Sequence, residues 1–160
     1  VLQVGPESSP TTYLFFADFG GRVLVYDWDD LDDANDDGNR GKAFARYEVR
    51  ESVTDYLPGG NVYNVLVDRV ETSDENGPLE VFYVYVPVTR VGIEVLRFDP
   101  TAPPDQRLTP VHLIETAADP HWVELRVDDR GPEPVKTMIV TDLLGGIRVY
   151  GYGAERPADG

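Results

Sequence analysis

Residues 15–26 read Phe-Phe-Ala-Asp-Phe-Gly-Gly-Arg-Val-Leu-Val-Tyr: an apolar segment, a turn that ends in glycine, and a second segment of alternating character. Residues 138–150 repeat this order as Met-Ile-Val-Thr-Asp-Leu-Leu-Gly-Gly-Ile-Arg-Val-Tyr, and residues 82–96 carry a third copy. Short alternating segments rich in Val, Tyr and Phe are typical of β-strands, and glycine turns join such strands into antiparallel hairpins. The three copies therefore predict an all-β fold built from repeated antiparallel units.

Gly, Pro, Asp and Asn residues, which favour turns, also separate short strand-like segments in the rest of the chain. The whole sequence then contains about eleven short strands. We expect these strands at residues 1–4, 12–18, 22–28, 43–52, 61–70, 80–89, 93–99, 110–117, 121–128, 135–142 and 147–152. The segments at 43–52 and 110–117 supply a fourth strand to a unit. We therefore predict one β region over residues 1–160, with a partial unit at 1–28, a unit with insertions at 43–99, a partial to full unit at 110–153 and a tail at 154–160.

The segment Asp18-Phe19-Gly20-Gly21-Arg22, with its flanking strands, resembles the blade signature of NHL and YVTN-type β-propellers. The Asp-Pro-His-Trp-Val segment at 119–123 is similar to the stretch that leads into the innermost strand of such blades. The copy at 82–96 departs from the pattern, since it has Pro-Val-Thr at 87–89 where the Asp would fall.

This resemblance implies antiparallel four-stranded blades. Eleven strands would make about two and three quarter blades, whereas closed propellers typically have four to eight. We therefore expect a partial propeller that is completed by further polypeptide or by other chains. A smaller sandwich whose repeats imitate blades is the third interpretation.

Composition limits the function. The 160 residues include 29 Asp and Glu against 14 Lys and Arg, and the net charge of −15 repels nucleic acid and anionic lipid. No cysteine is present, which excludes disulfides and thiolate chemistry. The longest apolar run, at 81–88, is far shorter than the roughly 20 residues that span a bilayer. Because the sequence begins at Val1 rather than Met, a removed signal segment is permitted, and we expect an extracellular or periplasmic location.

One candidate binding site follows from the propeller resemblance. The chain has two histidines, His112 and His121, and neither lies in a Ser-His-Asp or His-Glu-x-x-His pattern. In propellers the innermost strands line a central channel, so the resemblance implies a binding rim formed by Asn61, Asn64, His121 and Trp122. The competing interpretation is structural: the histidine shapes a turn and the tryptophan fills core.

Residues 29–41 concentrate acidic side chains and contain the D-x-N-x-D-G core of a calcium loop. Its candidate oxygen ligands are Asp33, Asn35, Asp37 and the backbone carbonyl of Asn39. An EF-hand would need a glutamate where Phe44 stands, and no helix is expected on either side, so we predict a strand-flanked Ca²⁺ site with a structural role. A solvated acidic turn is the alternative.

Two classes of function remain. The first is a non-catalytic propeller-type module that binds a protein or glycan partner, or further blades, within a larger assembly. The second is part of a lactonase- or esterase-like hydrolase, in which a channel metal held by the rim would activate water or a carbonyl. Asp18 and Asp142 occupy equivalent places before two glycine turns, and we assign both to turn structure because such carboxylates accept hydrogen bonds from backbone N–H groups of the turn.

Overall fold

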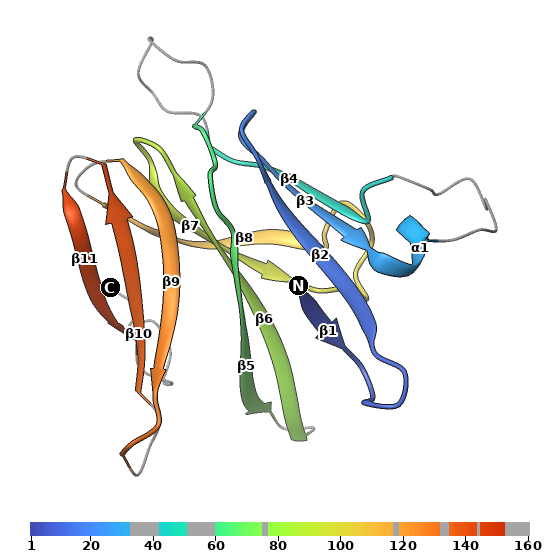
Figure 1. Ribbon diagram of the computed structural model, residues 1–160. Coiled ribbons are helices and arrows are strands. Elements are labelled where there is room, and N and C mark those ends of the chain that lie inside the picture. The colour runs from blue at the N-terminus through green and yellow to red at the C-terminus, as the bar shows by residue number, and fades with distance from the viewer. Residues whose placement is uncertain are drawn as a thin grey trace.

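The repeated order of strand, turn and strand produces three antiparallel sheets in the computed structural model (Figure 1). The structure describes residues 1–32, 42–50, 60–74, 77–116, 119–131, 135–143 and 145–152. In every sheet, strands that follow one another along the chain are hydrogen-bonded neighbours. The predicted all-β class with antiparallel sheets is confirmed, and whether these sheets are propeller blades stays a prediction.

Sheet 1 contains β1 (Leu2–Val4), β2 (Thr11–Asp18), β3 (Arg22–Asp27) and β4 (Ala45–Glu48). Sheet 2 contains β5 (Leu66–Asp74), β6 (Gly77–Val88), β7 (Gly92–Phe98) and β8 (Leu108–Ile114). Sheet 3 contains β9 (Pro120–Asp128), β10 (Val135–Asp142) and β11 (Gly146–Tyr152). Since β4 pairs with β3 and β8 with β7, the segments that begin at 43 and 110 close sheets 1 and 2.

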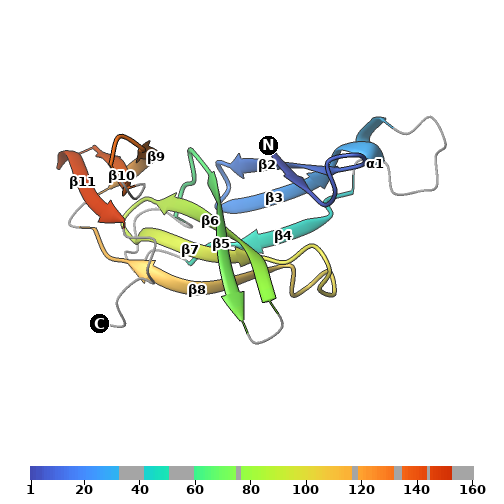
Figure 2. The same cartoon turned by 90° about the horizontal axis from the view of Figure 1, so that it is seen from below.

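A short helix, α1 (Trp28–Asp32), follows β3, so the expectation that no helix flanks residues 29–41 was wrong. The physical reason is an N-cap: Asp27 Oδ1 accepts a hydrogen bond from the backbone N–H of Asp29 at 3.1 Å. The helix and sheet 3 lie at opposite ends of the molecule in both views (Figures 1 and 2). Among the described residues, no helix has the length and apolar character needed to cross a membrane.

Sheet 2 lies between the other two sheets and is covered on both faces (Figure 1). Because successive side chains of a strand point to opposite faces, each strand of sheet 2 contributes to two cores. Side chains such as Val84, Val86 and Leu96 pack toward sheet 1. The alternate residues of the same strands, such as Tyr85 and Val95, pack toward sheet 3.

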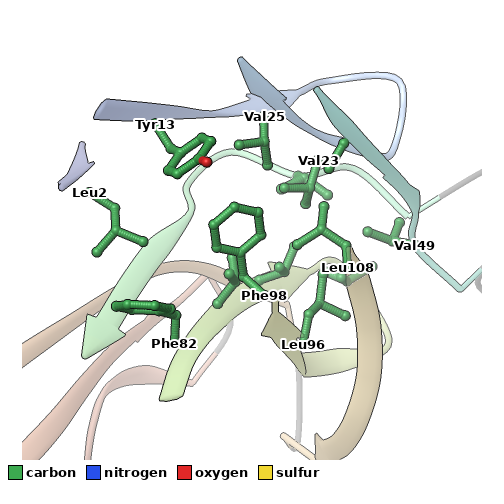
Figure 3. Close-up of a cluster of buried hydrophobic side chains, with 14 residues drawn as sticks. Leu2, Tyr13, Val23, Val25, Val49, Phe82, Leu96, Phe98 and Leu108 are labelled. Atoms are coloured by element: carbon green, nitrogen blue, oxygen red, sulfur yellow. The ribbon is translucent and has the colours of Figure 1, made fainter. Parts of the chain in front are cut away.

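The core between sheets 1 and 2 is centred on Phe98, whose side chain points toward Tyr13 and Val25 (Figure 3). The Phe98 ring lies 5.2 Å from Tyr13 and 5.1 Å from Phe15, both in edge-to-face geometry. Each buried aromatic or branched side chain of this kind stabilises the fold by about 1.5–3 kcal/mol. This core therefore holds sheet 1 against sheet 2.

Corresponding positions in the three sheets are fixed by their central turns. The pairs Asp18↔Arg22, Val88↔Gly92 and Asp142↔Gly146 close the three hairpins, each around a turn of the same length. The turns are residues 19–21, 89–91 and 143–145. Gly21 is thus the last turn residue of sheet 1, whereas Gly92 and Gly146 begin the next strand. The three hairpins therefore follow the sequence repeat, but the glycine of the first copy lies one residue earlier, relative to the turn, than the glycines of the other two copies.

With this correspondence, the sheets stack head to tail. We call the side of a sheet that faces the next sheet its forward face, and the opposite side its backward face. The forward face of sheet 1 includes Tyr13, Phe15, Ala17, Val23 and Val25. The corresponding residues of sheet 2 include Tyr83, Tyr85, Ile93 and Val95, and these contact sheet 3. Both internal interfaces therefore join a forward face to a backward face.

Candidate functional site

The candidate site lies beside the central turns of sheets 2 and 3. At this end of each sheet the chain enters the first strand, β5 or β9, through what we call an entry segment. The two entry segments have the same irregularity. Trp122 pairs with Thr141, but Pro120 pairs with Asp142, so the residue between them is bulged. In sheet 2 an isolated bridge joins Val62 to Val88 at the corresponding place. The predicted strand at 61–70 consequently begins only at Leu66.

The entry segments are anchored by similar hydrogen bonds. The backbone N–H of Asp119 donates to Asp142 Oδ1 at 3.1 Å, and the backbone N–H of Asn61 donates to Thr89 Oγ1 at 2.9 Å. The backbone N–H of Thr89 in turn donates to the Asn61 carbonyl at 3.2 Å. A threonine hydroxyl in sheet 2 therefore performs the anchoring that an aspartate performs in sheet 3. The predicted binding residue Asn61 is fixed in place through its backbone.

A row of three rings crosses all three sheets at this end. Tyr63 and His121 stack with ring centroids 4.4 Å apart and an interplanar angle of 38°. Phe19, from the turn of sheet 1, meets the other side of the row at 5.3 Å from Tyr63 with an edge-to-face angle of 81°. Phe19 and Tyr63 are both exposed. The row offers exposed aromatic surface and one imidazole, which are groups suited to stacking and hydrogen bonding with a bound partner.

Asn64 links the two entry segments directly. Its side-chain oxygen Oδ1 accepts a hydrogen bond from the backbone N–H of Val123 at 3.1 Å. The carboxamide therefore joins the entry of β5 to β9 and helps to position His121 against Tyr63. This oxygen already has a structural partner, although it was one of the predicted binding groups.

Trp122 is adjacent to His121 in sequence but does not belong to the ring row. It alternates with Val123, whose side chain is buried in the core between sheets 2 and 3, so Trp122 lies on the forward face of sheet 3. About half of its surface is exposed, at 52%. Of the four predicted residues, the structure thus brings the segments that carry Asn64 and His121 together, holds Asn61 against Thr89, and places Trp122 on a different surface.

The turn carboxylates have the role expected from the sequence. Asp18 Oδ1 accepts a hydrogen bond from the Gly20 N–H at 3.0 Å, and Asp142 Oδ1 accepts one from the Gly145 N–H at 3.0 Å. The hydrogen bond from Gly20 and the ion pair with Arg22 lower the pKa of Asp18 below its ordinary value. This part of the sequence interpretation is confirmed.

Sequence reasoning missed a polar cluster between sheets 1 and 2. The side chain of Glu94, on β7, is fully buried, and its Oε1 accepts a hydrogen bond from the backbone N–H of Arg50 at 3.1 Å. The Arg50 Nε lies 3.3 Å from the same oxygen, and the Tyr47 hydroxyl is also hydrogen-bonded to Glu94. Burial and the Glu94 carboxylate raise the pKa of Tyr47 to about 12. The available signal was a charged residue inside the apolar run at 93–96.

A second missed contact joins sheets 2 and 3. The Lys136 ammonium lies 2.8 Å from both carboxylate oxygens of Asp68, and both side chains are largely shielded from solvent. The two residues are far apart in sequence, so no local pattern could have paired them. Among the described residues, each internal sheet interface therefore combines an apolar core with an ion pair that is at least partly buried.

The predicted calcium ligands Asp33, Asn35, Asp37 and Asn39 lie outside the described residues. Within the part of the chain that the structure describes, no group of three or more His, Asp or Glu side chains is placed to hold a metal ion. His112 lies on β8, exposed and paired with Val95. Comparisons with protein-family models, curated proteins and solved structures found no match.

Proposed function

We propose that the chain is a non-catalytic binding and assembly module of the β-propeller type, in which the three sheets are successive blades flanked by further sheets. The observation that carries this proposal is the exposed forward face of sheet 3. The same positions are buried in sheets 1 and 2, where a following sheet covers them. An exposed face with an apolar centre that the described residues leave uncovered is typical of an assembly surface.

Two matched positions support the proposal quantitatively. Val25, Val95 and Val149 lie at the same distance beyond the three central turns, and their exposed fractions are 0%, 6% and 65%. Two residues closer to the turn on the same strands, Val23 and Ile93 are fully buried, whereas Ile147 is 72% exposed. The residue types are β-branched in every case, so burial differs while chemistry does not. Sheet 3 has the forward face of an internal sheet, and no sheet among the described residues lies against it.

The binding role is assigned to the ring row. Its members come from the entries of β5 and β9 and from the turn before β3, which are the places where a propeller presents the rim of its channel. We propose that Tyr63 and His121 contact a protein or glycan partner there, and that Asn61 and Asn64 hold the two entry segments in position. A Tyr63→Ala variant should then lose partner binding without loss of the fold, because Tyr63 is exposed.

We also propose that Asp33, Asn35, Asp37 and the carbonyl of Asn39 bind Ca²⁺, which would neutralise mutually repelling carboxylates and tie down the loop. Calorimetric titration of the wild type against an Asp33→Ala, Asp37→Ala double variant tests this. Equal heats from both proteins would leave a solvated acidic turn.

The blade arrangement can be tested within one chain. In a propeller the first strands of successive sheets converge on an axis and the last strands diverge, whereas the layers of a sandwich stay parallel. Because the chain has no cysteine, pairs of spin labels can be introduced without background. Pulsed dipolar spectroscopy should give a shorter distance between Gln3→Cys and Arg126→Cys on the first strands than between Asp27→Cys and Gly151→Cys at matched positions of the third strands. Equal distances would contradict the proposal.

A further inference from the structure

Resting on the proposed function, we propose that the sheet that covers the forward face of sheet 3 is supplied by a second copy of this chain. The backward face of sheet 1 in that copy would pack on the forward face of sheet 3, so that copies assemble head to tail. This assigns one interface to the forward face of sheet 3 and one to the backward face of sheet 1. At both interfaces the partner is another copy of this chain.

The forward face of sheet 3 has an apolar centre. Ile147 and Val149 on β11 lie beside Thr141 and Ile139 on β10, according to the register Thr141↔Ile147 and Ile139↔Val149. Trp122 extends the surface onto β9, where it pairs with Thr141. Ile147, Val149 and Trp122 are all more than half exposed. The surface is therefore continuous across the three strands of this sheet.

The backward face of sheet 1 is apolar in the same way. Phe16 is 47% exposed and lies across from Leu24, and Leu14 lies across from Tyr26. The Phe16 and Tyr26 rings meet edge to face at 5.7 Å. The corresponding backward-face residues of sheets 2 and 3 form the two internal cores. Sheet 1 thus offers the surface that sheet 3 would need opposite it.

The internal interfaces show which faces match. Sheet 1 meets sheet 2, and sheet 2 meets sheet 3, always with a forward face against a backward face. The next contact of the same kind is between sheet 3 and the sheet 1 of another copy. Such a head-to-tail contact is heterologous: it closes into a ring if the rotation between copies allows, and otherwise continues as an open chain. A twofold dimer would instead pair two forward faces, which neither internal interface does.

Charge on the two faces is balanced locally. On sheet 3, Arg126 Nε lies 3.2 Å from Glu124 Oε1. On sheet 1, Asp18 pairs with Arg22, and Arg46 pairs with Glu48. Docking would therefore cover ion pairs rather than single charges, which is far less costly. Copies still repel one another through the net charge of −15, so association should strengthen when salt is raised from about 0.15 M to about 0.5 M.

Sedimentation velocity of two face variants, alone and mixed, tests the inference. Ile147→Glu/Val149→Glu removes the forward surface, and Phe16→Glu removes the backward surface, with Phe16→Ala as a milder second variant. The wild type should form species heavier than the 17.8 kDa monomer, and each charged variant alone should be monomeric. A mixture of the two charged variants should form a one-to-one dimer only, because one intact interface is left. Self-association should weaken by about 100-fold or more in each variant.

Three outcomes would overturn the inference: a wild type that stays monomeric at both salt concentrations, a Phe16→Glu variant that still dimerises with itself, or a mixture that does not associate. Unchanged circular dichroism and denaturant midpoints would show that the variants fold, as expected for substitutions on outer faces. The spin-label distances within one chain are independent of copy number. If those distances hold while the wild type is monomeric, the proposed function stands and the second copy is excluded as the covering sheet.

Discussion

The forward faces of sheets 2 and 3 carry the same type of residue in opposite surroundings. Val95 is 6% exposed beneath sheet 3, whereas Val149, at the corresponding position, is 65% exposed. The repeat therefore determines what a face is made of, and the neighbour opposite determines whether it is buried. A substitution at the two kinds of face should consequently change different properties of the protein.

The largest expected effect is a charge placed on a covered face. Val25→Asp puts a carboxylate among the apolar side chains of the core between sheets 1 and 2, and should lower the free energy of unfolding by about 4 kcal/mol or more. Urea denaturation followed by circular dichroism measures this. Val149→Asp is the matched control on the uncovered face, and in dilute protein it should change the same quantity by no more than about 0.5 kcal/mol. Similar losses in both variants would show that Val149 is already in a core of the single chain.

A smaller effect is expected from the ion pairs. Lys136→Met leaves the half-buried Asp68 carboxylate without its partner, which should cost about 1–3 kcal/mol. Arg126→Met breaks the exposed pair with Glu124 on the other face of sheet 3 and should cost less than about 0.5 kcal/mol. Double-mutant cycles with Asp68→Asn and Glu124→Gln measure the two coupling energies. Equal couplings would mean that sheets 2 and 3 are not closely packed in solution.

The smallest effect is a dependence on alkaline pH at the interface of sheets 1 and 2. The Tyr47 pKa is raised to about 12, whereas an unfolded chain has a tyrosine pKa of about 10. Below the unfolded pKa the phenol is neutral in both states, and its contribution to stability is fully present. Between these two values the unfolded state ionises first, so the free energy of unfolding falls as pH rises.

Urea denaturation from about pH 9 to about pH 12 checks this dependence, and Tyr47→Phe should flatten it. The difference in absorbance titration between the wild type and the variant isolates Tyr47 from the other tyrosines. A difference titration centred near pH 10 would mean that the hydroxyl is not held against Glu94.

Much of the fold could be predicted because alternation and turn residues are local signals. The strand at Val135–Asp142 was predicted with its observed bounds, and the turn aspartates Asp18 and Asp142 were assigned the bonds they make. The irregularities before β5 and at the start of β9 could not be predicted, since they depend on hydrogen bonds that the backbone N–H groups of Asn61 and Asp119 donate to the distant side chains of Thr89 and Asp142. The propeller resemblance also placed Trp122 with His121 on one rim, whereas alternation with the buried Val123 puts Trp122 on the forward face of sheet 3.

The candidate site was only partly predictable for a related reason. The propeller resemblance placed the entry segments that carry Asn64 and His121 side by side, but the stacking of Tyr63 on His121 and the bond from Val123 to Asn64 join different sheets. The pairing of Lys136 with Asp68 also depends on how sheets stack. Contacts between sheets have no periodicity along the chain, and so sequence patterns do not reveal them.

The most direct test of the account is the chemical accessibility of one side chain. With no native cysteine, Val149→Cys, Val25→Cys and the exposed control Asp105→Cys can each be labelled with a maleimide in native protein. Val149→Cys should be protected like Val25→Cys in concentrated protein and should react as fast as Asp105→Cys after dilution. If Val149→Cys reacts as fast as Asp105→Cys at every concentration, no second copy covers the forward face of sheet 3, and the head-to-tail assembly is contradicted.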